Sequence, residues 1–335
     1  MAALSAAARV PLGRRGLEVT RLGFGGAPIG GLFEPVSDEA AALALDAVWD
    51  TGVRLIDTAP HYGAGLSERR IGAWLRGRAR QEREQVVIST KVGRLLVEPD
   101  GGPPPEGVEG FYGALPYQRV FDYSRDGVLR SVEQSLARLG VDRVGVLLIH
   151  DPDQHWQQAV GEAYPTLHEL RDQGVTAAIG AGMNQAEMLT RFVRETDVDC
   201  VLLAGRYTLL DQRGLVELLP LCEERGVAVI AGGVFNSGVL ADPREGATFD
   251  YAPAPPDVLD RARRLHTVCA RHGVPLTAAA LQFPLAHPAV ATVLTGARSE
   301  TEVRENAALL DVPVPGAVWE ELRATGLLPA AAPVP

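Results

Sequence analysis

The chain has 335 residues, 46% of them hydrophobic, and a formal net charge of −10 at pH 7. This length is ordinary for one β/α barrel, so it does not require two domains. The acidic balance disfavours nucleic acid as a partner and supplies no polybasic patch for a membrane surface.

Composition also indicates a compartment. No stretch approaches the roughly 18 apolar residues of a membrane span. The start, MAALSAAARVPLGRRG, lacks the sustained apolar core of a secretory signal. The cysteines, Cys200, Cys222 and Cys269, are far apart and form no CxxC pair, which indicates neither disulfides nor zinc. We therefore expect a cytoplasmic protein with reduced thiols, no membrane association and no metal.

The first predicted element is a short hairpin over residues 10–20, VPLGRRGLEVT, which would close the bottom of a barrel. Eight strand-then-helix units follow. The expected strands cover residues 21–26, 54–59, 85–92, 144–150, 176–183, 200–206, 227–233 and 289–296. The expected helices cover residues 37–52, 66–77, 124–140, 163–174, 185–195, 214–226, 256–273 and 299–310, with Ser37 capping the first.

Near-continuous apolar strands that alternate with amphipathic helices indicate a parallel sheet buried on both faces. Eight such units predict an α/β fold, a (β/α)8 TIM barrel, with residues 1–335 forming a single domain.

Two segments interrupt the alternation. Residues 94–123 are rich in glycine and proline and contain several aromatic residues. A loop this long inside a compact domain is usually functional or disordered. Because it leaves the end of the strand that carries Lys91, it belongs on the catalytic face, and we favour a substrate lid over a flexible tether. The tail from Pro313 is expected to add one helix around Trp319 and then to fray over residues 325–335.

Four polar residues stand near the ends of three expected strands: Asp57 and Tyr62 in RLIDTAPHYG, Lys91 in QVVISTKVG and His150 in VGVLLIHDPD. Strand ends form the active site of a β/α barrel. Tyrosine, with an unperturbed pKa of about 10, is a poor acid and a worse base near neutral pH, and a nearby ammonium lowers that pKa. We expect Lys91 to be that ammonium, with Asp57 holding it and His150 beside the reacting oxygen. Such a site moves a proton on and off an oxygen, which is half of a carbonyl reduction or an alcohol oxidation.

The segments IDTAPHYGAGLSE, STK, IHD and TGARSETEVRENAALL occur in the order typical of the aldo-keto reductase superfamily, which the chain resembles over almost its full length. The stretches AIGAGMN, LLAGRYTLLDQ and GGVFNSGVL resemble its sugar-oxidising branch, whose members act on L-fucose and related D-threo-aldoses, L-galactose or pyridoxal. The resemblance implies Tyr62 as the general acid/base and Lys91 as the group that lowers its pKa. It further implies Asp57 as the partner of Lys91 and His150 as the residue that orients the substrate oxygen.

The activity that this resemblance implies is oxidation of an aldose at C1 by NAD(P)⁺ to the aldonolactone, with reduction of an aldehyde as the reverse. Oxidation of pyridoxal or another alcohol is the alternative within the same fold. A cofactor-binding regulatory protein with little turnover is the alternative from another class. The expected partner is a small-molecule sugar or aldehyde, and the oligomeric state stays open.

The resemblance also implies a nicotinamide cofactor at the barrel mouth, because no side chain supplies a hydride. The matching positions are Met183, Asn184, Tyr207, Gly296, Arg298, Ser299, Glu302, Glu305 and Asn306. Tyr207 is expected to stack on the nicotinamide, and the helix N-terminus after Gly296 suits a phosphate. Ala204 stands near the position where many relatives carry a glutamine for the nicotinamide amide.

The choice between NAD and NADP depends on two charges. Glu302 stands where NADP-preferring relatives carry an arginine, and its carboxylate would repel a 2′-phosphate. Arg298 would attract one. NAD is therefore favoured over NADP.

Substrate contacts are expected from His155, Trp156 and Phe235. The glycine-rich GFGGAPIGG does not fit a GxGxxG turn followed by a helix, and we interpret it as packing at the barrel mouth. A metallohydrolase with His61, His150, Asp151 and His155 as ligands is the rival barrel enzyme. It is disfavoured because the first strand carries no HxH pair and Lys91 would have no role.

Overall fold

The structure is a computed structural model that describes residues 5–99 and 110–335. Within these residues, eight parallel strands close into a barrel in the order β10-β11-β14-β3-β4-β5-β8-β9. The strands are β3 (Leu22–Gly25), β4 (Leu55–Asp57), β5 (Val87–Val92), β8 (Val144–His150), β9 (Thr176–Met183), β10 (Cys200–Ala204), β11 (Ala228–Gly232) and β14 (Val290–Gly296). Each of the eight predicted strands is present, which confirms the barrel.

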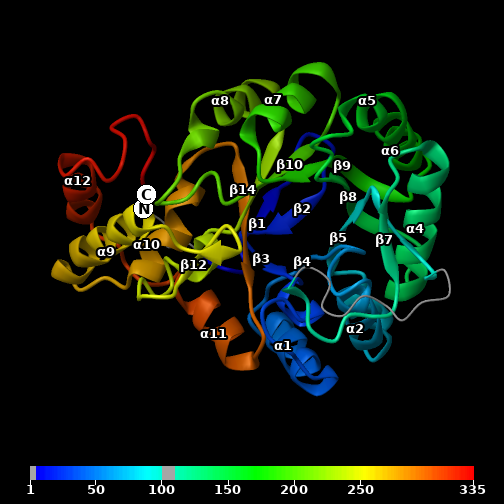
Figure 1. Cartoon of the computed structure of the whole chain (residues 1–335), viewed down its shortest axis with the longest axis horizontal. Helices are drawn as coiled ribbons and strands as arrows, with labels where there is room; N and C mark the ends of the chain where they lie inside the picture. The colour runs from blue at the N-terminus through cyan, green and yellow to red at the C-terminus, as the bar shows by residue number, and fades with distance from the viewer. Residues whose placement is uncertain (1–4, 100–109) are drawn as a thin grey trace.

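The helices surround the barrel (Figure 1). Those that follow the barrel strands are α1 (Asp38–Asp50), α2 (Leu66–Arg76), α4 (Arg125–Leu139), α6 (Tyr164–Asp172), α7 (Ala186–Glu195), α8 (Leu218–Arg225), α9 (Pro256–Arg271) and α11 (Glu300–Ala308). Ser37 caps α1 as predicted, because its side chain accepts a hydrogen bond from the backbone N–H of Ala40. Four helices outside the predicted alternation are α3 (Arg80–Arg83), α5 (Trp156–Gln158), α10 (Leu276–Gln282) and α12 (Gly316–Ala324), the last of which carries Trp319.

The N-terminal hairpin, β1 (Arg9–Pro11) and β2 (Glu18–Thr20), closes the end of the barrel where the strands begin. Leu12 and Val19 pack against barrel-interior side chains such as Leu148. Gly13 has a φ of +74°, and a Cβ there would lie 2.5 Å from the carbonyl oxygen of Asp199, so this turn requires glycine. The barrel interior is thus sealed at this end, and the opposite end remains for the site.

The C-terminal tail differs from the expectation of fraying. Leu327, Leu328 and Ala332 are buried in the hydrophobic core. Arg261 of α9 donates a hydrogen bond to the carbonyl of Leu327 at 2.6 Å, and Arg323 of α12 donates to that of Ala332 at 2.6 Å. The tail therefore packs onto the barrel, because its apolar side chains and its carbonyl groups both find partners there.

The insertion of residues 94–123 begins and ends as an antiparallel hairpin rather than as an open loop. Its strands are β6 (Arg94–Val97) and β7 (Gln118–Phe121). Residues 100–109, part of the expected lid, lie outside the described residues. Beyond them, the chain contacts the loop after β3: the N–H of Phe33 donates to Gly110 at 2.9 Å, and that of Tyr112 donates to Gly31 at 2.8 Å.

None of the helices in the described part of the chain combines the length and the apolar character that a membrane span requires.

Candidate active site

Three neighbouring strands bring the predicted polar residues together at their carboxyl ends. Asp57 ends β4, Lys91 is the penultimate residue of β5, and His150 ends β8. Lys91 Nζ donates to Asp57 Oδ2 at 2.7 Å, to the carbonyl of Thr58 at 2.8 Å and to Tyr62 Oη at 3.1 Å. The Lys91 side chain is 2% exposed, so this ammonium bonds to protein groups instead of water. Asp57, Tyr62, Lys91 and His150 therefore lie together at one end of the barrel, as the sequence predicted.

Burial and charge act in opposite directions on these groups. Burial raises the pKa of Tyr62 to about 12, although Lys91 opposes this rise. Burial alone would lower the pKa of Lys91, but Asp57 and Tyr62 together raise it above its usual value. Lys91 does lower the pKa of Tyr62, as expected, but the loss of hydration on burial raises that pKa by more. At neutral pH Tyr62 is a phenol beside an ammonium.

His150 is a neutral imidazole. Burial, helped by the charges of Lys91 and Arg94, holds its pKa well below the usual value. Its ring meets the ring of Tyr62 edge to face, with 6.0 Å between the centroids. The Asp151 carboxylate lies 3.4 Å from His150 Nε2 and accepts a hydrogen bond from Arg94 at 2.8 Å.

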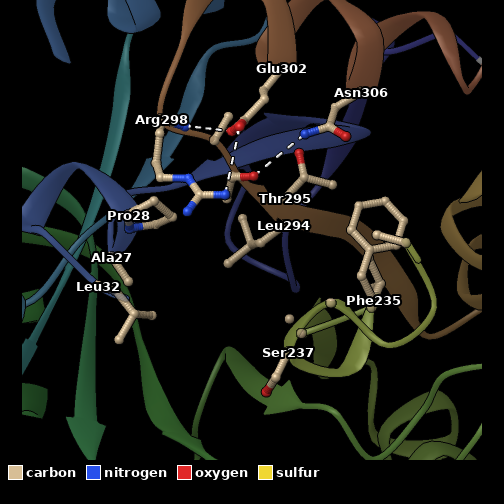
Figure 2. A pocket seen from close by; sticks show the side chains of 18 of the residues that line it. Ala27, Pro28, Leu32, Phe235, Ser237, Leu294, Thr295, Arg298, Glu302 and Asn306 are labelled. Carbon is tan, nitrogen blue, oxygen red and sulfur yellow. Dashed lines mark hydrogen bonds and ion pairs between the residues drawn. The ribbon is translucent and has the colours of Figure 1, made fainter. Parts of the chain in front are cut away.

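A cavity of about 810 Å³ opens beside Asp57 and Tyr62. Its walls come from two loops, the one after β3 and the one after β11, and β14 lies between them. In Figure 2, Pro28 and Leu32 lie on one wall and Phe235 and Ser237 on the other. The volume is in the range of small-molecule sites, roughly 300–1,000 Å³. Gly232 and Gly233 leave part of the wall without side chains, which lets a ligand approach the backbone.

The far end of this cavity is formed by the start of α11. Of the predicted cofactor positions, the cavity is lined by Gly296, Arg298, Glu302, Glu305 and Asn306. Ser299 caps α11 by accepting from the N–H of Glu302. The cavity therefore fits an elongated ligand, with one end beside Tyr62 and the other at the start of α11.

The charges at this end are already paired, which the sequence did not indicate. Arg298 contacts Glu34 at 3.0 Å. It also contacts Glu302 at 3.7 Å, and Glu302 accepts a hydrogen bond from the backbone N–H of Arg298 at 2.8 Å (Figure 2). The expected free amides at this helix N-terminus are thus partly occupied, since Ser299 and Glu302 each accept from one of them.

Three other predicted cofactor positions, Met183, Asn184 and Tyr207, are not among the residues that line this cavity. Met183 is buried at the end of β9 and Asn184 is the exposed residue after it. Tyr207 needs a correction: its ring is 1% exposed and packs against Phe283 and His287, with 5.1 Å and 5.9 Å between ring centroids. Because that ring is enclosed by the core, it does not offer a stacking face at the barrel mouth.

The predicted substrate positions separate into three environments. Phe235 lines the cavity. His155 stacks on Phe121 of the insertion hairpin, with 5.2 Å between centroids. Trp156 packs against Phe192 of α7 at 4.8 Å, and Arg191 covers its ring. Trp156 therefore belongs to the packing between helices and not to the cavity, which corrects its prediction as a substrate contact.

Several residues around the site were not among the individual site residues predicted from the sequence. Phe111 of the insertion stacks on Tyr62 with 6.1 Å between centroids. Phe33 and Tyr251, from the two loops that wall the cavity, lie 6.0 Å apart. Both have positive φ, 68° and 65°, a conformation rare for aromatic residues and invisible to periodicity. Asn236, also at positive φ, donates to the carbonyl of Gly205 beside Ala204.

Comparisons with known proteins agree with the barrel fold. The Aldo/keto reductase family model matches residues 21–326. A pyridoxal 4-dehydrogenase of Microbacterium luteolum is 43% identical over 97% of this chain and 99% of that protein. A D-threo-aldose 1-dehydrogenase of a Pseudomonas species is 41% identical over 94% of this chain and 96% of that protein. The holo form of an aldo-keto reductase from Bacillus halodurans has a TM-score of 0.75 at 26% identity, with 97% of each chain covered.

Proposed function

Because the chain belongs to the aldo/keto reductase family and is an NAD(P)-dependent oxidoreductase of that type, we propose that it oxidises an aldose of the L-fucose, or D-threo, type at C1 to the aldonolactone. One observation carries the proposal: Lys91 Nζ bonds to Asp57 and Tyr62 at once, beside a cavity that extends to α11. The 41% identity to a D-threo-aldose 1-dehydrogenase supports the choice of substrate.

In this proposal, the anomeric hydroxyl of the sugar lies against Tyr62 Oη and His150. Tyr62, in its deprotonated form, takes the hydroxyl proton as the C1–H bond breaks. The ammonium of Lys91 stabilises the phenolate, and Asp57 keeps Lys91 in place. A bound nicotinamide would supply the acceptor for the hydride that leaves C1. Gly296, Arg298, Glu302, Glu305 and Asn306 would hold its adenosine end, because they line the far end of the cavity.

For the cofactor we propose a preference for NAD. The 2′-phosphate of NADP needs an available cation, and Arg298 already contacts the carboxylates of Glu34 and Glu302. Binding of a 2′-phosphate here would bring it close to two negative charges or require Arg298 to leave them.

The insertion supports a role over the substrate. Phe111 stacks on Tyr62, and Phe121 stacks on His155, so aromatic faces surround the mouth next to the tyrosine. Aromatic rings of this kind can pack on the apolar face of a sugar. We propose that the insertion covers the substrate and leaves the adenosine end open.

Pyridoxal is the second candidate. Its cyclic hemiacetal carries the same group as an aldose, a carbon with one hydroxyl and one ring oxygen, so the same residues would oxidise it to a lactone. The ring of Phe111 near Tyr62 can also pack on a planar substrate, and the 43% identity to a pyridoxal 4-dehydrogenase supports this candidate.

A panel of aldoses and pyridoxal, each assayed with NAD⁺ and NADP⁺, tests the proposal. We expect the highest kcat/KM for L-fucose or another D-threo-aldose with NAD⁺, and a loss of roughly 10² to 10⁴ in kcat for Tyr62→Phe. Higher kcat/KM on pyridoxal would assign the second candidate. Absence of turnover on every compound, with NAD⁺ still bound, would favour a cofactor-binding protein with little activity.

A further inference from the structure

The insertion contacts the backbone of His150, in addition to placing Phe111 beside Tyr62. Tyr123, which follows β7, is fully buried. Its hydroxyl donates to the carbonyl oxygens of both His150 at 2.6 Å and Asp151 at 2.9 Å. Burial raises the pKa of this hydroxyl, so it remains a donor at neutral pH. One side chain therefore fixes two consecutive backbone groups at the end of β8.

The start of the insertion is shaped to accept this ring. Gly93, directly before β6, has a φ of +101°. A Cβ at Gly93 would lie 2.1 Å from Cε1 of Tyr123, so only glycine leaves room for the ring. The two ends of the insertion thus meet around Tyr123, and the hydroxyl is held at the end of β8 by packing on both sides.

Asp151 is held in a sparsely populated conformation at the same place. Its φ of +42° is left-handed, a region that costs a residue with a side chain free energy unless its surroundings enforce it. Its backbone carbonyl accepts from Tyr123, its backbone N–H donates to Gly182 at 3.1 Å, and its carboxylate accepts from Arg94 of β6. As a result, the carboxylate remains 3.4 Å from His150 Nε2.

This arrangement selects one tautomer of the neutral imidazole. A carboxylate accepts hydrogen bonds and donates none, so it favours a hydrogen on Nε2 of His150. His150 Nδ1 is buried and has no hydrogen-bond partner among the described residues. A buried N–H without an acceptor is rare in proteins, whereas an unused lone pair is tolerated more often, which again favours the hydrogen on Nε2.

We propose that Tyr123 and Arg94 are positioning residues that act through Asp151 and fix His150 as the Nε2–H tautomer. The Asp151 contact of 3.4 Å is longer than an ordinary hydrogen bond, so the Nε2 hydrogen can be shared with the substrate oxygen. The proposal rests on the role of His150 in the proposed function. It gives the insertion a second role, because the strands β6 and β7 then set the orientation of a catalytic group.

Tyr123→Phe tests this directly, because it keeps the ring against Gly93 and removes only the donor. We expect kcat on the best substrate to fall by about tenfold, since small displacements of a catalytic group cost one to two orders of magnitude. The Kd for NAD⁺ should change by less than about twofold. Tyr164→Phe is the matched control: it removes a hydroxyl that accepts from the N–H of Asp197, before the start of β10, and should leave kcat unchanged.

A second readout does not depend on turnover. In ¹⁵N-histidine-labelled protein, with His150 assigned through His150→Gln, we expect the wild type to show a hydrogen on Nε2 and a bare Nδ1. Tyr123→Phe and Asp151→Asn should both give a mixture of tautomers. Asp151→Asn also serves if Tyr123→Phe does not fold.

Two results would overturn the proposal: a hydrogen on Nδ1 in the wild type, or a kcat for Tyr123→Phe equal to that of Tyr164→Phe with an unchanged tautomer. Failure of the proposed function would look different. In that case the wild type would turn over no sugar and no pyridoxal, while the tautomer of His150 and its dependence on Tyr123 would still be measured.

Discussion

Tyr62 illustrates at the scale of one residue why proximity to a cation does not by itself settle a protonation state. Lys91 donates to its hydroxyl, but burial has the larger effect, and the pKa of Tyr62 rises to about 12. The phenol is the acid needed for reduction of a carbonyl. Oxidation needs the phenolate, which is rare at neutral pH.

The pH dependence follows from this direction. Because Tyr62 loses its proton only toward pH 12, the rate of sugar oxidation should rise between pH 7 and 10, by at most tenfold per pH unit. His61 and His150 should add no inflection near pH 6.5, because burial lowers the pKa of both. Initial rates across this range check the prediction, with Tyr62→Phe as the control that loses the rise. An oxidation rate independent of pH would remove Tyr62 as the base.

Glu302 should determine much of the cofactor preference. Glu302→Gln keeps a side chain that can accept from the N–H of Arg298 but removes one negative charge and frees Arg298 from one partner. We expect the Kd for NADP⁺ to fall several-fold, which corresponds to about 1 kcal/mol, with little change for NAD⁺.

Glu34→Gln removes the other carboxylate that contacts Arg298 and should act in the same direction. Arg298→Ala should weaken NADP⁺ binding more than NAD⁺ binding. If the wild type binds NADP⁺ more tightly and Glu302→Gln is neutral, the adenosine end does not lie at these residues.

Among the elements, the insertion has two parts, to which we assign separate roles. Its strands β6 and β7 carry Arg94 at one end and lead to Tyr123 at the other, beside His150 and Asp151. The segment between the strands brings Phe111 to Tyr62. Changes to the strands should therefore alter kcat, whereas changes to the connecting segment should alter substrate binding.

Replacement of residues 101–117 by a short Gly/Ser linker tests the second part. We expect the KM for the sugar to rise, because the ring of Phe111 no longer packs at the mouth, while the Kd for NAD⁺ from fluorescence quenching stays the same. Phe111→Ala should reproduce part of the rise, and Tyr112→Ala, whose side chain is exposed, should not. Loss of NAD⁺ binding in a folded variant would place this segment over the cofactor.

In the whole molecule, a buried ion pair that supports the fold lies at the closed end of the barrel, opposite to Tyr62 and Lys91. At the closed end, the carboxylate of Asp199 accepts from Arg15 at 2.9 Å, Arg171 at 2.8 Å and the N–H of Ile179 at 2.9 Å. Asp199 and Arg171 are almost fully buried. These bonds join the N-terminal hairpin to the barrel, and none of them reaches the catalytic end.

Asp199→Ala should therefore destabilise the fold and leave activity per folded molecule unchanged. Removing one partner of a buried ion pair costs roughly 3–5 kcal/mol, because Arg171 keeps a buried charge. Asp197→Asn is the control: its carboxylate contacts the same arginines but is 46% exposed, so its loss should cost about 1 kcal/mol or less. Urea unfolding measures both. A large loss of kcat in folded Asp199→Ala would contradict this separation.

The alternation of apolar strands and amphipathic helices was enough to predict the eight strand-and-helix units and the four polar residues at or near the strand ends. Apolar periodicity reports which face of each element is buried, and closure of a parallel barrel brings the carboxyl ends of its strands to one rim. The orientation of side chains beyond that rim depends on contacts between segments that are distant in sequence. Tyr207 and Trp156 lie in sequence where a site contact is expected, but the ring of Tyr207 packs against Phe283 and that of Trp156 against Phe192. The pairing of Arg298 with Glu34 and the burial that raises the pKa of Tyr62 likewise come from residues distant in sequence, so no local pattern records them.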